Sequence, residues 1–306
     1  MREFLPEGSK WGTEANTAIL SSEANIEACV GTGTIVEAIC VACDDKHNML
    51  VDLNGIEGFI PRIEGALGIE EGTVRDVGLL TKVGKPISFV VTKKTTNSAG
   101  KVRFELSRRK LQTECFETYI KKLEPGTVIN AKVTHLANFG SFVDVGVGIV
   151  SLIPLDRLSV SRIRTPADRF KIGQNIHAVV TGFVDNKLQL SHKELLGTWQ
   201  ENADMFEAGT TVVGIVRSIE TYGIFVELAP NLAGLAEVKE DIEVGQYVSV
   251  FIKSIIPDKC KVKLVIVDKL EEAPTLPDLK YFITEGKLSE WNYTTEESPK
   301  QIKTVF

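Results

Sequence analysis

Three stretches of the chain carry the same landmarks in the same order, and this repetition limits the fold more than any other feature. Each stretch begins with Gly-Thr and later has a Val-Gly or Ile-Gly pair before a second apolar run. The Gly-Thr pairs lie at 33–34, 126–127 and 209–210, and the later pairs at 83–84, 172–173 and 244–245. Apolar and polar residues alternate after the later pairs, as at 175–180 and 247–252, which is typical of half-buried strands. The chain is therefore predicted to consist of tandem small β units.

Five short strands per unit fit a small closed barrel of the OB type. The predicted fold is mainly β, with three tandem five-stranded OB-fold barrels joined by short helices and an irregular C-terminal tail. Both connectors repeat apolar residues at three- and four-residue steps, as amphipathic helices do, and Trp199 is predicted to pack between domains. The predicted parts are an N-terminal arm (1–28), repeats 1 to 3 (29–110, 125–193 and 209–268), linker helices (111–124 and 194–208) and the tail (269–306). The aromatic residues of the tail favour packing against a barrel.

Two copies of an aromatic-Gly-x-Phe motif mark the first bend of the second and third units. They are Phe139-Gly140-Ser141-Phe142 and Tyr222-Gly223-Ile224-Phe225. Glycine permits a sharp bend or bulge there, so that the two rings of each motif can emerge side by side. Paired exposed rings on a small β unit suit stacking on unpaired bases. Strand alternation does not decide whether Phe139 and Phe142 both point outward, and burial in the core is the alternative.

The formal net charge of the chain is −6, but the charge is unevenly distributed. The second unit has eight Lys and Arg residues against four Asp and Glu residues, whereas the third has six against eight. Cations gather between the third and fourth predicted strands of the second unit, at Arg157, Arg162, Arg164, Arg169 and Lys171. A solvated charge run is the usual explanation of such a loop. Its place in the unit that also has two Phe residues at the bend favours contact with phosphates.

Catalytic and metal chemistry find little support in the sequence. Cys40 and Cys43 with His47 nearby have the spacing of half a zinc site, but no second such pair follows. Aligned on the other units, Cys40 takes the place of Val133 and Val216, which predicts a buried strand position. Nothing looks like a dedicated nucleophile, base or phosphate-cradling loop. We therefore predict no catalytic residue, no metal site and no cofactor.

A membrane location is also not predicted. No run approaches the ~18 apolar residues of a membrane helix, and the first twenty residues lack a basic start followed by an apolar block. A cytoplasmic location is the resulting expectation.

The order of these motifs resembles S1-type RNA-binding repeats, the OB-fold module named for bacterial 30S small-subunit ribosomal protein one. The likeness covers about residues 27 to 268 and rests on Gly-Thr-Val, aromatic-Gly-x-Phe-Val, Val-Gly-Gln and Leu-Ser-x-Lys. It implies a nucleic-acid platform of two aromatics, a third-strand histidine, and an Asp and a basic residue at the last hairpin. In the second unit these are Phe139, Phe142, Asp185 and Lys187, with Pro154 in place of the histidine. In the third they are Tyr222, Phe225, Asp258 and Lys261, with Glu237 in place of the histidine.

The first unit departs from this pattern. It has His47 and Leu50 at the aromatic positions and Pro61 on the third strand, although Arg103 keeps the basic residue. A platform without aromatic faces stacks bases poorly. The resemblance implies that some repeats dock on protein while others hold RNA, and the first unit is of the former kind.

Three functional hypotheses follow. The first is a non-catalytic single-stranded RNA-binding protein that acts in translation or mRNA binding, with stacking on Phe139 and Tyr222. Its phosphate contacts would come from Arg157, Arg162, Arg164 and Lys187. The second is a protein-interaction scaffold that docks on the ribosome, on other translation proteins or on an RNA-processing complex. The third is a subunit that acts beside a separate RNA-processing enzyme.

Overall fold

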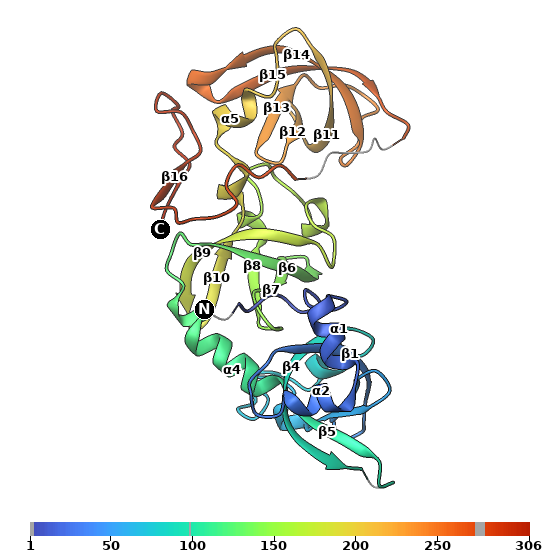
Figure 1. The fold of residues 1–306 in the computed structure, drawn as a ribbon. Helices are drawn as coiled ribbons and strands as arrows, with labels where there is room; N and C mark the ends of the chain where they lie inside the picture. The colour runs from blue at the N-terminus through green and yellow to red at the C-terminus, as the bar shows by residue number, and fades with distance from the viewer. Residues whose placement is uncertain (1–2, 98, 273–278) are drawn as a thin grey trace. The chain divides into compact units, whose positions relative to one another are not determined.

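Three closed five-stranded β-barrels make up most of the protein in the computed structural model, which describes residues 3–97, 99–272 and 279–306 (Figure 1). The strand orders are β1-β2-β3-β5-β4, β10-β8-β7-β6-β9 and β11-β12-β13-β15-β14. Neighbouring strands are antiparallel, except that the third and fifth strands of each barrel run parallel. The prediction of three tandem OB-like barrels in a mainly β fold is confirmed.

The first barrel is preceded by two short helices that contribute to its core. Its elements are α1 (Glu14–Leu20), α2 (Glu23–Ala28), β1 (Val36–Cys43), β2 (Met49–Asp52), β3 (Glu57–Ile60), η1 (Arg62–Glu64), α3 (Val77–Leu80), β4 (Pro86–Thr96) and β5 (Val102–Ser107). Thr13 and Ser22 cap the two helices by accepting from backbone N–H groups. Leu20 and Ile26 are buried in the barrel core, where Cys40 is fully buried as predicted.

The second and third barrels are built alike. The second comprises β6 (Val128–Ala137), β7 (Gly140–Asp144), β8 (Val150–Pro154), η3 (Leu155–Arg157), η4 (Pro166–Asp168), β9 (Asn175–Val184) and β10 (Lys187–Ser191). The third comprises β11 (Thr211–Glu220), β12 (Gly223–Ala229), β13 (Leu232–Ala236), β14 (Tyr247–Ile256), η6 (Pro257–Lys259) and β15 (Lys261–Lys269). In the third, inward residues such as Val248, Val250 and Ile252 alternate along β14 with outward ones.

Short helices follow the first two barrels. They are α4 (Arg108–Thr118) with η2 (Ile120–Lys122), and η5 (Lys193–Leu196) with α5 (Trp199–Ala203). Ser107 caps α4 by accepting from the Lys110 backbone N–H. Thr198 and Glu201 form a capping box at α5, and Trp199 is buried in the core cluster of the third barrel. Trp199 thus packs into the core of the third barrel, and Val160 of the second barrel packs against the same cluster, which agrees with the predicted packing between domains.

The described part of the chain forms two compact units. Residues up to Leu123 pack together with Asp144–Val150, the turn that follows β7, and form the first unit. The second unit contains Glu124–Val143 and the residues from Ser151 onward, and therefore holds the third barrel and most of the second. The final elements, β16 (Glu290–Asn292) and β17 (Lys303–Val305), pair in the second unit.

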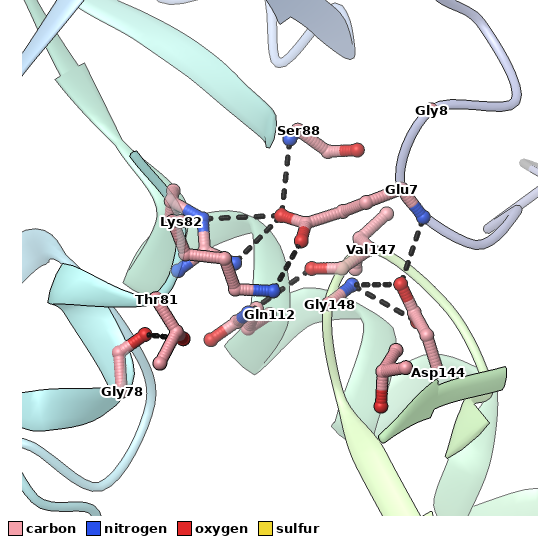
Figure 2. A network of polar contacts seen from close by, with 12 residues as sticks. Glu7, Gly8, Gly78, Thr81, Lys82, Ser88, Gln112, Asp144, Val147 and Gly148 are labelled. Atoms are coloured by element: carbon pink, nitrogen blue, oxygen red, sulfur yellow. Dashed lines mark hydrogen bonds and ion pairs between the residues drawn. The ribbon is translucent and has the colours of Figure 1, made fainter. Parts of the chain in front are cut away.

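A buried ion-pair network anchors the start of the chain in the first unit (Figure 2). The Glu7 carboxylate lies 2.6 Å from Nη2 of Arg108 and 2.6 Å from Nζ of Lys82, and the Arg108 side chain is 1% exposed. The Glu7 backbone N–H donates to Oδ2 of Asp144 at 2.8 Å. Burial by itself would raise the pKa of Glu7, but Arg108 and Lys82 outweigh it and lower that pKa to about 2. Burial, assisted by the Glu7 carboxylate, raises the pKa of Asp144 to about 6.

Replacement of Glu7 by Gln is expected to destabilise the first barrel strongly. The change leaves the buried Arg108 guanidinium without its carboxylate partner, which typically costs about 3–5 kcal/mol. Hydrogen exchange of a β4 peptide, followed by mass spectrometry, should accelerate by roughly 100-fold or more. The matched control is Glu3→Gln, because Glu3 is an exposed carboxylate on the same segment. Equal protection of β4 in both variants would contradict the prediction.

The titration of Asp144 predicts a stability change with pH. Because its folded-state pKa is raised from the ordinary 3.8 to about 6, protonation of Asp144 stabilises the unit fully below pH 3.8. This contribution is lost as the pH rises through about 6. The Asp144→Asn variant has no titrating group at this position and does not lose this contribution. Its unfolding free energy should therefore increase relative to that of the wild type as the pH is raised. Urea midpoints measured from about pH 4 to about pH 7 check this. A difference that does not change with pH would count against it.

Candidate nucleic-acid interface

The two rings of the second-barrel motif form an edge-to-face pair at the bend between β6 and β7. Phe139 is 61% exposed and Phe142 is half-buried. Their ring centroids are 5.9 Å apart and the planes meet at 85°. The backbone is fixed beside them, because the Leu155 N–H donates to the Phe139 carbonyl oxygen at 2.9 Å. The alternative that both rings lie in the core is therefore wrong, since Phe139 offers a ring face to solvent.

Glycine is required at this bend by the close approach of β8. A Cβ atom on Gly140 would collide with the carbonyl oxygen of Ile153. In the third barrel, a Cβ atom on Gly223 would lie 2.6 Å from the carbonyl oxygen of Ala236. The aromatic-Gly-x-Phe motif thus encodes the same strand geometry in both barrels.

The third barrel repeats the ring pair. Tyr222 is 67% exposed and Phe225 is half-buried, with ring centroids 6.2 Å apart and an interplanar angle of 89°. Strand pairing places Phe225 opposite Leu235, and Leu235 opposite Lys263. This row crosses β12, β13 and β15 and ends in an exposed cation. Lys261 lies two residues before Lys263 and is exposed on the same face of β15, because Val262 and Leu264 point inward.

The last hairpin of the second barrel projects the other predicted side chains. Asp185 and Asn186 have φ values of 49° and 59°, as in a tight two-residue turn. Asp185 and Lys187 are both exposed, and neither has a salt bridge within the described residues. Lys187 and Gln189 lie on one face of β10, and Gln189 pairs with Leu152 of β8. Phe183, on the same hairpin, is 39% exposed.

The sequence interpretation did not single out His135, Phe183 and Lys263. His135 is exposed on β6, and its ring centroid lies 5.9 Å from that of Phe142. Lys263 could have been found from strand alternation, because it lies between the inward-pointing residues Val262 and Leu264 and therefore points outward. For His135 the signal was its spacing of seven residues from Phe142, which the third barrel repeats between Ser218 and Phe225.

The cationic loop of the second barrel divides into exposed and buried residues. Arg162 and Arg164 are exposed, and no carboxylate of the described residues forms a salt bridge with either. Arg157 is half-buried and donates from Nη1 to Oγ1 of Thr181 at 2.9 Å. Arg169 was expected among the surface cations, but its side chain is 2% exposed. It is therefore unavailable to a ligand.

Arg169 instead forms a buried ion-pair cluster in the second unit. Its Nη1 lies 2.9 Å from Oε1 of Glu227, and Nε of Arg217 lies 2.9 Å from Oε2 of the same carboxylate. Arg217 Nη1 also pairs with Asp168 at 2.8 Å. A small cavity of about 60 Å³ lies here, lined in part by Arg164 and Arg217. The loop that carries Arg162 and Arg164 is thus held against the third barrel.

The corresponding face of the first barrel differs chemically. Leu50 pairs with Phe59, and Phe59 pairs with Glu105, so the row ends in an acid. The Arg103 guanidinium lies 4.2 Å from the centroid of Phe59 and 3.4 Å from a Glu57 carboxylate oxygen. The only ring in this row is therefore already covered by a cation of the same barrel.

The C-terminal segment packs against the second and third barrels, as its aromatic content predicted. The Tyr281 hydroxyl lies 3.0 Å from Nε2 of His192, and its ring lies 4.8 Å from that of His177. Burial lowers the pKa of His192 to about 4, which keeps this imidazole neutral at physiological pH. Trp291 and Tyr293 are buried in the core cluster of the third barrel.

The described ranges hold neither a metal-binding cluster nor a helix able to span a membrane. Residues 3–97, 99–272 and 279–306 contain no cluster of three or more His, Cys, Asp or Glu side chains able to hold a metal ion. In the same ranges, no helix combines the length and the apolar character that crossing a membrane demands.

Comparison with known proteins identifies the relatives of the chain. Residues 122–193 match the family model of the S1 RNA binding domain. The chain is 29% identical over 249 residues to small ribosomal subunit protein bS1 of Leuconostoc lactis, which covers 76% of this chain and 56% of that protein. It is 30% identical over 247 residues to the bS1 homolog of Bacillus subtilis (strain 168), which covers 75% of this chain and 62% of that protein.

A third relative is an enzyme, and the match is partial. A 4-hydroxy-3-methylbut-2-enyl diphosphate reductase of Clostridium acetobutylicum is 31% identical over 205 residues, which covers 66% of this chain and 31% of that protein. The chain also spans less than two thirds of both ribosomal relatives. The predicted resemblance to S1-type repeats is confirmed.

The ion-pair cluster predicts how the cationic loop responds to mutation. In Glu227→Gln, the buried guanidinium groups of Arg169 and Arg217 lose their shared carboxylate, at a cost of about 3–5 kcal/mol. The loop should then open, and trypsin should cleave after Arg162 and Arg164 at least tenfold faster. Glu237→Gln changes an exposed carboxylate of the same barrel and should leave cleavage unchanged. Equal cleavage rates in the two variants would refute this account of the loop.

Proposed function

Because residues 122–193 are an S1 RNA binding domain in a chain distantly similar to ribosomal protein bS1, we propose that this protein binds single-stranded RNA. The second barrel contributes most of the affinity, and the third assists. The observation that carries the proposal is the Phe139 ring, which is 61% exposed and set edge-on against Phe142. A ring held in this way offers a flat apolar face to an unpaired base.

Stacking and charge act together in this proposal. Base stacking on an aromatic side chain contributes about 1–3 kcal/mol per base and tolerates any base, so sequence preference is slight. Phosphates are contacted by Arg162 and Arg164, which are exposed and lack salt-bridge partners within the described ranges. Lys187 and Arg157 add positive charge on the hairpin and beside β9. Asp185, on the hairpin turn, is assigned to the site by the family resemblance.

The third barrel offers a second, smaller platform. Tyr222 provides the exposed ring, Phe225 supports it, and Lys261 and Lys263 supply cations on the same face. The third barrel carries more acidic than basic residues, and this weakens its attraction for RNA compared with that of the second barrel.

We assign the protein a non-catalytic role in translation or in binding of mRNA, in the cytoplasm. The similarity to bS1 proteins supports this role. A protein-docking scaffold is the second candidate function, and the first barrel favours it. Its platform row has Leu50 at an aromatic position and ends in Glu105, while Arg103 covers Phe59. Such a face has no open ring for a base.

A titration of the whole protein with a short labelled unstructured RNA tests RNA binding. Phe139→Ala should weaken binding by roughly 5- to 150-fold, as expected for about 1–3 kcal/mol of lost stacking. The matched control is Ile172→Ala, because Ile172 is an apolar side chain of the same barrel that is 66% exposed. Its affinity should equal that of the wild type.

Salt dependence and a pull-down complete the test. The logarithm of the binding constant should fall linearly with the logarithm of salt concentration, and Lys187→Gln should reduce the slope by about 1. Salt-independent affinity, or equal affinity of Phe139→Ala and wild type, would reject the proposal. Partners that remain bound to the protein in nuclease-treated lysate would then favour the docking function.

A further inference from the structure

Phe142 presents little ring face of its own. It is half-buried, and two rings pack against it: Phe139 edge-to-face, and His135 with centroids 5.9 Å apart and planes inclined by 35°. His135 is an exposed residue, so its imidazole is accessible from solvent. Phe142 thus contacts the rings of both Phe139 and His135, each of which is more exposed than it is.

We propose that His135 is the second base-stacking position of the second barrel and that Phe142 is a support for the rings of Phe139 and His135. This inference rests on the proposed RNA-binding function. Its ligand is an unpaired base next to the base on Phe139. Pro154 occupies the third-strand position of the platform, and His135 instead supplies an imidazole from β6. An imidazole ring is a recognised stacking surface for RNA bases.

The third barrel provides an internal comparison. Ser218 lies opposite Phe225 on the paired strands β11 and β12, and it precedes Phe225 by seven residues, as His135 precedes Phe142. At these equivalent positions the third barrel therefore has one exposed ring, Tyr222, where the second has two, Phe139 and His135. On this basis the second barrel stacks two bases and the third stacks one.

Affinity measurements on ring variants test the assignment. With a short labelled unstructured RNA, His135→Ala should bind roughly tenfold more weakly than wild type, within the range for loss of one stacked base. His135→Phe keeps a stacking face and should retain wild-type affinity. His47→Ala is the matched control, because His47 has the position of Phe139 in the first barrel, and it should bind as the wild type does. Ser218→His should increase affinity by adding a ring to the third barrel.

The NMR resonances of the histidine rings test the assignment in the wild-type protein, without any substitution. On addition of RNA, the ring protons of His135 should shift upfield, whereas those of His177 and His192, which pack on Tyr281, should not. A His135→Phe variant as weak as His135→Ala would overturn stacking as the role of this residue.

The failure of this inference is distinguishable from that of the proposed function. Weak binding by Phe139→Ala together with wild-type binding by His135→Ala would overturn the inference alone. Lack of RNA binding by the wild-type protein would overturn both.

Discussion

The close approach of two backbones at one glycine sets the geometry of each candidate platform. Gly140 lies against the carbonyl of Ile153 and Gly223 against that of Ala236, where a side chain would not fit. This contact bends the first strand into the second and places the residue before the glycine at the rim of the barrel. As a result, Phe139 and Tyr222 are exposed although each is a large aromatic residue that the core would otherwise accommodate. Everything proposed about base stacking depends on that bend.

The second strands of the second and third barrels each carry a buried acid at the same position of the repeat, and each acid contacts residues outside its own barrel. Asp144 follows Phe142 by two residues and Glu227 follows Phe225 by two, and both carboxylates are buried. Asp144 accepts from the Glu7 backbone N–H, while Glu227 pairs with Arg169 and Arg217. The equivalent residue of the first barrel, Asp52, is exposed. The same position of the repeat is thus a buried anchor in the second and third barrels and a surface residue in the first.

Local patterns in the sequence predicted the fold, because each pattern reflects the geometry of residues that are close together in the chain. The Gly-Thr and Val-Gly landmarks, with alternating residues after them, predicted three barrels, and the aromatic-Gly-x-Phe motif predicted paired rings at a bend. Alternation could not assign Arg169, since its partner Glu227 is 58 residues away and belongs to another barrel. It also could not reveal His135, whose significance comes from a ring on the neighbouring strand. The assignments of Phe139, Phe142, Asp185, Lys187 and Lys261 to RNA contact stay predictions.

The return of the chain end to the second barrel has a consequence for the order of folding. Val128 at the start of β6 donates to the carbonyl of Gly286, and Leu288 donates to that of Gly126. Tyr281 lies against two histidines of the same barrel. During synthesis, the second barrel emerges from the ribosome well before these residues do, although domains otherwise complete their folding from the N-terminus onward. Its final packing must therefore wait until residues 281–288 have been synthesised, and a fragment that stops at residue 268 would leave His177 and His192 uncovered.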